Sequence, residues 1–425
     1  MNRLHLVLAF GLLVSLSYIV VAEKDPKVSE DVLHRPTPIP DRIILTWAGD
    51  PTTTQAVTWR TDESVKNPMA EIAEAGDGPE FVKHAVGHAA ASETFQSDLN
   101  TARYHSVRFT QLKPGTMYAY RVGDGFNWSE WNQFRTAESN RAPVEFLYVG
   151  DAQNDIYQLW SRLIRQGYSE APKARFIVHA GDLVNKATRD AEWGEWHAAA
   201  GWINRSVVAF PTPGNHEYGT KQLTTHWRPQ FTLPENGVAG LEETNYYLDI
   251  QGVRMVALNS NRMQQEQAEW LDKLLTNNPN RWTVLTFHHP VYSAARSRDN
   301  KDLRAMWQPI FDKHRVDIVL TGHDHTYARS NLRTGVNTQE GSAGTVYVVS
   351  VSGPKMYTLD REPWMQRAAE NTQLCQIIRI SGDTLQYEAR TARGILYDAF
   401  DLHKQDGKPN QLVNKVPQTA ERRRP

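Results

Sequence analysis

Short stretches in which apolar and polar residues alternate make up the chain between residues 41 and 138. Such alternation is typical of β-strands with one buried face. The turn-forming residues Gly49-Asp50-Pro51 separate the first two stretches. The predicted strands cover residues 43–47, 56–60, 105–109, 117–122 and 131–136. We therefore expect an all-β, antiparallel sandwich over residues 41–138, which supports the rest of the protein or borders its substrate site.

The pattern changes after residue 138, where apolar strands begin to alternate with helical segments. Strands are predicted at residues 144–149, 175–179, 206–210, 246–250, 254–258, 282–287 and 316–320, and helices at 156–165, 189–202, 264–275 and 303–313. This alternation indicates a layered α/β domain with mostly parallel central strands, extending over residues 144–400. We interpret Trp193, Trp196 and Trp202, which recur at near-helical spacing, as core residues.

The two ends of the chain differ from these domains. Residues 1–22 combine the basic Arg3, an apolar run and small residues at the end, which is the layout of a cleaved secretory signal peptide. An uncleaved membrane anchor is the alternative, although polar residues interrupt the run. Residues 23–40 form a Pro-rich leader, and residues 401–425 form a polar tail that we expect to be frayed. We expect a secreted or periplasmic protein without a stable membrane anchor after processing.

Composition narrows the possible partners. The 47 basic and 48 acidic residues nearly cancel, so no overall field favours nucleic acid or an anionic membrane. Cys375 is the only cysteine, which excludes an intrachain disulfide. Because Cys375 lies in an apolar, strand-like run, we expect a buried structural thiol there.

Five short polar motifs follow predicted strands of the α/β region. They are Gly150-Asp151-Ala152-Gln153, Gly181-Asp182-Leu183-Val184-Asn185, Gly214-Asn215-His216-Glu217, His288-His289-Pro290 and Gly322-His323-Asp324-His325. One Gly-Asp is usually only a turn, and one His-x-His is often structural. Ligands in α/β sheets bind where the strands end, so motifs at successive strand ends predict one common site. Oxygen and nitrogen ligands of this kind suit Zn, Mn or Fe.

The order of these motifs resembles the pattern of the metallophosphoesterase superfamily, and within it that of the purple acid phosphatases. The resemblance covers about residues 40–400. It implies an N-terminal fibronectin III-like sandwich followed by a four-layer α/β/β/α catalytic domain. In the first domain, the segment from Leu112 to Tyr120 resembles the tyrosine corner of fibronectin modules.

The resemblance also implies a role for each motif residue. It assigns metal ligation to Asp151, Asp182, Asn215, His288, His323 and His325. Asp182 is expected to bridge two metals, and His216 to stand beside them as a proton source. Two metals lower the pKa of a shared water and clamp the oxygens at phosphorus. The implied reaction is direct attack of a metal-bridging hydroxide on a phosphate monoester, in the manner of an acid phosphatase.

Two positions depart from the purple acid phosphatase pattern. Asn185 stands where that family has the tyrosine that ligates iron and gives the purple colour. Gln153 stands where it has a glycine, and where other superfamily members have a histidine ligand. Either side chain offers a carbonyl oxygen as a weak ligand. We predict a colourless protein with weaker binding at the first metal position.

Substrate contacts and function are less sharply indicated. Arg296 and Arg298 follow the predicted ligand His288 and are candidate phosphate contacts, although solvated loop charges are equally compatible with the sequence. His289 is a candidate supporting or substrate-binding residue. A phosphodiesterase or nucleotide pyrophosphatase on the same site is one alternative function, because loops decide the leaving group. A non-catalytic adhesion or binding protein on a phosphatase scaffold is the other; the sequence leaves the metal pair and the oligomeric state open.

Overall fold

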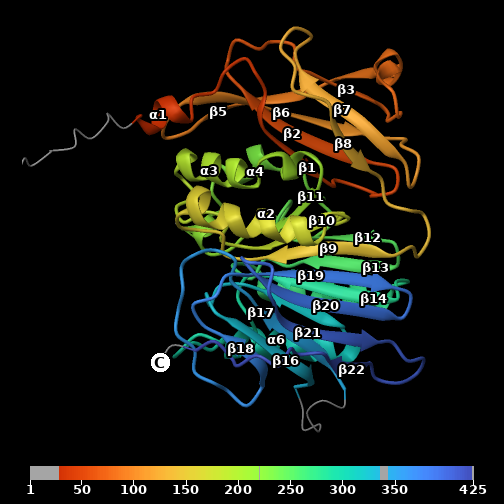
Figure 1. The fold of residues 1–425 in the computed structure, drawn as a ribbon, viewed down its shortest axis with the longest axis vertical. Coiled ribbons are helices and arrows are strands. Elements are labelled where there is room, and N and C mark those ends of the chain that lie inside the picture. Colours follow the sequence, from red (N-terminus) through yellow and green to blue (C-terminus); the bar gives the residue numbers. More distant parts are fainter. Residues whose placement is uncertain (1–27, 220, 336–342, 424–425) are drawn as a thin grey trace, which may run out of the picture.

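The computed structural model describes residues 28–219, 221–335 and 343–423 (Figure 1). The expected signal peptide lies outside these residues. Within them, no helix has both the length and the apolar character needed to cross a membrane. The expected leader contains one short helix, α1 (Glu30–Leu33).

The N-terminal region is a β-sandwich at one end of the elongated molecule (Figure 1). One sheet contains β1 (Asp41–Thr46), β2 (Gln55–Thr61), β5 (Ala91–Gln96) and β6 (Thr101–Phe109), and the other contains β3 (Met69–Glu74), β4 (Val86–Ala89), β7 (Met117–Gly123) and β8 (Asn132–Arg135). The short 3₁₀-helix η1 (Pro79–His84) connects β3 to β4. Trp59, Phe109 and Tyr120 are fully buried in its core. The Tyr118 hydroxyl accepts a hydrogen bond from the backbone N–H of Lys113 at 2.8 Å, which is the contact expected of a tyrosine corner.

The sandwich shares a sheet with the rest of the protein. β1 pairs in parallel with β11 (Val208–Thr212), with Thr46 opposite Ala209. The resulting sheet has 11 strands in the order β22-β21-β20-β19-β9-β10-β11-β1-β2-β6-β5. Because backbone hydrogen bonds run across this junction, the two regions are connected by more than a flexible linker.

Two sheets form the centre of the second region. The first contributes β9 (Val144–Val149), β10 (Phe176–Ala180), β11, β19 (Leu374–Ser381), β20 (Thr384–Thr391), β21 (Leu396–His403) and β22 (Gln411–Asn414). The second contains β12 (Tyr246–Ile250), β13 (Val253–Ala257), β14 (Trp282–Phe287), β15 (Ile318–Thr321), β17 (Thr345–Val349), β16 (Tyr327–Arg333) and β18 (Met365–Ala369). Within these sheets β9, β10 and β11 are parallel, as are β13, β14, β15 and β17.

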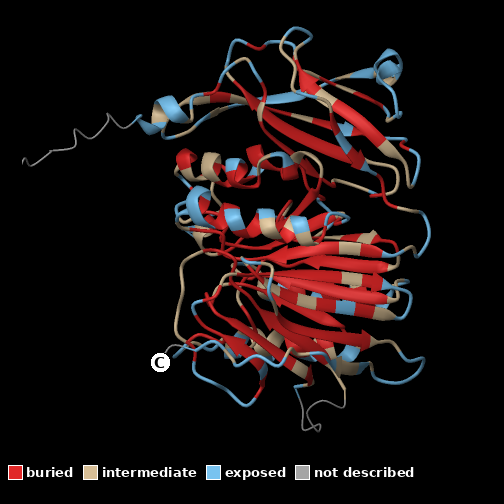
Figure 2. Ribbon diagram, viewed as in Figure 1, coloured by how far each residue is buried: buried red, intermediate tan, exposed pale blue. Residues whose placement is uncertain are grey.

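Helices cover the outer faces of both sheets. The α-helices are α2 (Ser161–Glu170), α3 (Asp190–Ala200), α4 (Trp227–Gln230), α5 (Gln264–Thr276) and α6 (Lys301–His314), and the shorter turns are η2 (Ile156–Trp160), η3 (Gly201–Arg205) and η4 (His216–Tyr218). Alternate residues of one strand face different layers: Met255 joins the core shared by the two sheets, whereas Val256 packs with Leu271 of α5. The strands are largely buried, as expected for sheets covered on both faces (Figure 2). The fold is the predicted β-sandwich followed by a layered α/β domain.

Several local expectations were wrong. The predicted helix over residues 189–202 ends at Ala200, because Gly201 adopts a φ of 59°. Trp193 and Trp196 are fully buried as expected, but Trp202 lies beyond this break and is 57% exposed.

The C-terminal segment is not a frayed tail, since β21 extends to His403 and β22 pairs with it. Cys375 is fully buried, and burial raises the pKa of its thiol to about 12, as expected of a structural cysteine.

Candidate metal centre

The motif residues converge because the strands that precede them end at the same edge. Asp151 follows β9, Asp182 follows β10, Asn215 follows β11, His288 follows β14, and His323 and His325 follow β15. Contacts cross between the two sheets here: the backbone N–H of His323 donates to both oxygens of Asp151, at 3.0 and 2.8 Å. His288 Nε2 lies 3.2 Å from Asp182 Oδ2. The carboxyl edges of both sheets thus form one site.

The backbone of these loops is unusual. Asp151 and Asp182 both have a φ of 51°, and His323 and His325 have φ values of 73° and 49°. Non-glycine residues in this left-handed region cost conformational energy, and such residues are concentrated at functional sites. Close packing adds a second constraint. A Cβ atom on Gly214 would lie 2.1 Å from Asp182 Oδ1, and one on Gly322 would lie 2.4 Å from Asp151 Oδ2.

The carboxylates of Asp151 and Asp182 belong to one group of possible metal ligands. Asp151, Asp182 and His325 are all buried, and each offers an atom within 4.8 Å of the others. Gln153 is also fully buried, and its Nε2 lies 2.9 Å from Asp182 Oδ2 and 3.1 Å from His325 Nε2. Gln153 therefore belongs to this group by position.

A second group consists of imidazoles. His288, His289 and His323 offer ring nitrogens within 4.8 Å of one another. His323 Nδ1 lies 3.1 Å from His288 Nε2, which in turn lies 3.0 Å from Asn215 Oδ1. His289 is held from the other side, since its Nδ1 lies 2.8 Å from the hydroxyl of Ser260.

The tautomers of two histidines suit metal binding. His288 Nδ1 lies 2.9 Å from the Ala180 carbonyl oxygen, and His325 Nδ1 lies 2.9 Å from that of Lys355. A carbonyl only accepts, so Nδ1 carries a proton in both rings, and Nε2 faces the site, where a metal ion would take the place of any proton that it carries. Metal-ligating histidines usually donate their other N–H in this way. This donor set, with two buried carboxylates, fits divalent or trivalent metal ions.

The electrostatics of the centre favour positive charge. Burial raises the pKa of Asp151 well above its ordinary value, and the adjacent Asp182 adds to the increase. Burial alone would lower the pKa of His288, but the carboxylates of Asp182 and Asp151 raise it to about 9. The two buried carboxylates thus stabilise a positive charge on His288. A metal ion bound at the same place would supply that positive charge instead.

His216 stands at the open side of the centre. Its ring is partly exposed, and Nε2 lies 3.8 Å from Asp182 Oδ2. Its Nδ1–H donates to the carbonyl oxygen of Asn185 at 2.5 Å, which fixes the ring orientation. Asn185 thus contributes a backbone contact to the site at the position where purple acid phosphatases carry their tyrosine.

Glu217 has a role that we did not predict. Its buried carboxylate accepts hydrogen bonds from four backbone N–H groups, those of Asp182, Leu183, Val184 and Gly214. It thereby joins the loops after β10 and β11. The Gly-Asn-His-Glu motif contained the signal, since an acidic residue closes it, but only the fold shows which loop it holds.

The structure separates the two candidate arginines. Arg298 Nη1 donates to the His323 carbonyl oxygen at 3.0 Å, and its guanidinium lies over the ring of Tyr357. Arg296 is not brought to the centre; it is 60% exposed and pairs with Asp360 at 2.8 Å. Arg298 therefore borders the centre, whereas Arg296 lies at the surface.

Both regions of the chain match sequence patterns of known protein families. The sequence pattern described as "Purple acid Phosphatase, N-terminal domain" matches residues 40–136, and that of "Calcineurin-like phosphoesterase" matches residues 144–327. Purple acid phosphatase 21 of Arabidopsis thaliana is 25% identical over 337 residues, covering 75% of this chain and 72% of that protein. Protein Rv2577 of Mycobacterium tuberculosis is 27% identical over 334 residues, which cover 68% of this chain but only 62% of that relative.

A solved structure shows the same fold. The purple acid phosphatase PPD1 from yellow lupin (Lupinus luteus) superposes with a TM-score of 0.73 at 19% identity, covering 85% of this chain and 74% of that one. The two sequence patterns adjoin in the same order as the two regions described above. The chain therefore contains a calcineurin-like phosphoesterase domain at residues 144–327, preceded at residues 40–136 by the N-terminal domain of the purple acid phosphatases.

Proposed function

We propose that this protein is a dinuclear-metal phosphatase that hydrolyses phosphate monoesters. The observation that carries the proposal is the position of Asp182. Its carboxylate belongs to the group with Asp151 and His325, and it also lies 3.2 Å from His288 of the imidazole group. One carboxylate shared between two ligand groups is the arrangement expected of a bridging ligand.

The residues divide into two proposed metal positions. The first consists of Asp151, His325 and Asp182, with Gln153 as a further oxygen donor in place of a tyrosine. The second consists of Asn215, His288, His323 and Asp182. Two Fe, Zn or Mn ions bound there would lower the pKa of a water and polarise the phosphoryl oxygens. Asn185 is a weaker candidate ligand, since its hydrogen bonds to Glu192 and His216 are made by its backbone.

His216 and Arg298 have proposed roles toward the substrate. His216 presents Nε2 beside Asp182 while its Nδ1–H is fixed, so it is placed to donate a proton to the leaving oxygen. Arg298 borders His323 and is half-buried, where a guanidinium pairs well with phosphate oxygens. His289, held by Ser260, would orient the imidazole group or contact the substrate.

We also propose the type of the N-terminal domain, the location of the protein and the kind of partner that it lacks. The two-sheet sandwich and the contact between Tyr118 and Lys113 support a fibronectin III-type N-terminal domain. The composition of residues 1–22 supports export to a periplasm or the medium, where phosphate esters are the substrates. No nucleic-acid partner is proposed, given the balanced charge.

The decisive experiment compares p-nitrophenyl phosphate with bis-p-nitrophenyl phosphate as substrates of metal-stripped protein, to which Zn, Mn or Fe is returned. Activity on the monoester that returns with metal and disappears in Asp182→Ala supports the proposal. Asp77→Ala, at an exposed position of the N-terminal sandwich, is the matched control and should retain activity. Preference for the diester would assign the protein to phosphodiester cleavage. Absence of both turnover and bound metal would favour a binding protein.

A further inference from the structure

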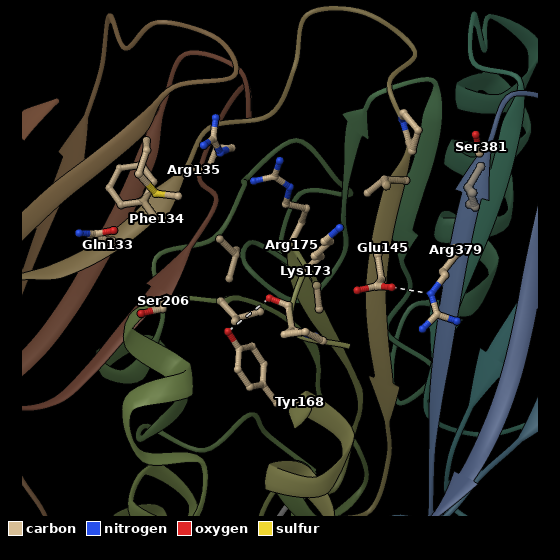
Figure 3. Close-up of a pocket in the computed structure, with 18 of the residues that line it drawn as sticks. Gln133, Phe134, Arg135, Glu145, Tyr168, Lys173, Arg175, Ser206, Arg379 and Ser381 are labelled. Atoms are coloured by element: carbon tan, nitrogen blue, oxygen red, sulfur yellow. Dashed lines mark hydrogen bonds and ion pairs between the residues drawn. The ribbon is translucent and has the colours of Figure 1, made fainter. Parts of the chain in front are cut away.

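A large cavity lies away from the metal centre. It has a volume of about 780 Å³ and is lined by both regions of the protein. The sandwich contributes Arg135 and Phe134 of β8, and the α/β domain contributes the segment before β10, the start of β9 and part of β19. Figure 3 shows these side chains around a common space.

The cavity lies at the opposite end of the strands from the metal centre. Val144 begins β9 and Asp151 follows it; Arg175 precedes β10 and Asp182 follows it. A strand rises about 3.3 Å per residue, so these strands hold the two sites about 20 Å apart. Nothing in the proposed hydrolysis uses the residues of this cavity.

The lining carries excess positive charge. Its charged residues are Arg135, Lys173, Arg175, Arg379 and Glu145. Glu145 is already paired with Arg379 at 2.5 Å, so it does not neutralise the other three. In Figure 3 the guanidiniums of Arg135 and Arg175 lie near each other, and the amine of Lys173 lies between them and the pair of Glu145 and Arg379.

The guanidinium of Arg175 has no hydrogen-bond or ion-pair partner among the described residues, although its side chain is half-buried. Burial, together with the nearby charge of Arg135, lowers the pKa of Arg175, and the charge of Glu138 opposes this decrease only in part. Two guanidiniums that repel each other in a cavity are unfavourable unless an anion lies between them. Arginine offers donors in a planar fork that matches phosphate oxygens.

An aromatic surface adjoins this charge. Trp202, which we had expected in the core, lines the cavity and is 57% exposed. Its ring lies 5.1 Å from that of Tyr168, at an interplanar angle of 89°. An exposed indole held edge-on by a second ring presents a face on which a planar ligand can stack.

We propose that this cavity binds a ring-bearing phosphate monoester, with the phosphate at Arg135, Lys173 and Arg175 and the ring on Trp202. A dianionic phosphate gains more from three cationic groups than a monoanionic carboxylate does. The ligand would contact both regions of the protein at once, and its binding does not depend on the proposed hydrolysis.

The test uses adenosine monophosphate as a probe, measured by titration calorimetry with the metal-stripped full-length protein. Without metals the probe is not hydrolysed and the carboxylates of the metal centre repel it. We expect one bound AMP per chain, and weaker binding of inorganic phosphate and of adenosine. Arg175→Gln and Lys173→Gln should each weaken AMP binding about ten-fold. Trp202→Ala should weaken AMP binding without changing that of phosphate.

Controls separate this site from general charge and from the metal centre. Arg162→Gln removes an exposed arginine of α2 outside the cavity and should leave AMP binding unchanged. Asp182→Ala should leave it unchanged as well. Arg175→Gln should fold with undiminished thermal stability, because it relieves the repulsion from Arg135. The proposal is overturned if AMP does not bind, if adenosine binds equally well, if Arg162→Gln acts like Arg175→Gln, or if Asp182→Ala abolishes binding.

Discussion

Nε2 of Gln153 lies 2.9 Å from Oδ2 of Asp182, while Oε1 of the same amide is buried and has no hydrogen-bond partner among the described residues. A half-turn of the amide exchanges the two atoms and directs Oε1 toward Asp182 and His325. A bound metal would favour that orientation, because a carbonyl oxygen is a ligand and an amide nitrogen is not.

Substitution of Gln153 should therefore change metal retention. Gln153→Ala removes the only candidate side-chain replacement for the missing tyrosine that the structure places in this group, so we expect about ten-fold weaker binding of one of two metals. Gln153→His should bind that metal more tightly than the parent. Metal content after dialysis against a graded chelator series, determined by mass spectrometry, measures both effects. Equal retention by all three proteins would exclude Gln153 as a ligand.

Because Asn185 replaces a tyrosine, we predict that the iron-loaded protein has no purple colour. An amide cannot give the charge-transfer absorption of a tyrosinate bound to iron, so the iron-loaded protein should be colourless. Asn185→Tyr restores a phenol at this position and should produce an absorption band in the visible after loading with ferric ion. A visible band in the parent protein would contradict the prediction, and the apo forms of both proteins provide the baseline.

Glu217 should be needed for the shape of the centre. Glu217→Gln places an amide NH₂ against backbone N–H groups, because each oxygen of Glu217 accepts from more than one of them. We expect a loss of about 2–3 kcal/mol in the free energy of unfolding, together with weaker metal binding. Urea unfolding measures the first and metal titration the second. Glu266→Gln, at an exposed position on α5, should change neither.

The buried charges between the two regions should stabilise the molecule strongly. The carboxylate of Asp190 accepts hydrogen bonds from both Nη atoms of Arg42, at 2.6 and 2.8 Å. Arg60 Nη1 donates to Asp190 Oδ2 at 3.3 Å. Asp190→Ala leaves Arg42 buried without its carboxylate partner, so we expect the free energy of unfolding to fall by about 3–5 kcal/mol. The exposed pair of Lys113 and Glu74 is the contrast, and Glu74→Ala should cost less than about 1 kcal/mol. Similar losses in the two variants would contradict this prediction.

Acid should destabilise the N-terminal sandwich through His105. Burial lowers the pKa of His105 from 6.5 to about 4, so the folded protein keeps this ring neutral where the unfolded chain protonates it. The unfolded state then binds more protons, and stability falls as the pH falls from about 6.5 to about 4. His105→Gln should show a smaller decrease between about pH 7.5 and about pH 5 in urea unfolding. An unchanged pH dependence would show that His105 does not contribute.

The order of strands and helices could largely be predicted from the sequence, because apolar periodicity records which faces are buried. β9, β14 and their motifs illustrate this, since a buried strand and a polar turn follow each other directly. β4 and β5 escaped prediction because they are mostly exposed and lack an apolar period. The role of Glu217 and the separation of Arg296 from Arg298 depend on contacts between loops that are distant in sequence. No local pattern encodes such contacts.

The parallel pairing of β1 with β11 has a consequence for how the chain is made. During synthesis the N-terminal sandwich emerges first, but one edge of its sheet remains open until residues around Ala209 leave the ribosome. At about 5–20 residues per second, the residues between the end of β8 at Arg135 and Ala209 take about 4–15 s to synthesise. An open strand edge invites pairing with other chains, so a nascent or truncated protein that lacks β11 should be prone to aggregate. Expression of the N-terminal region alone would therefore require its edge at β1 to be blocked.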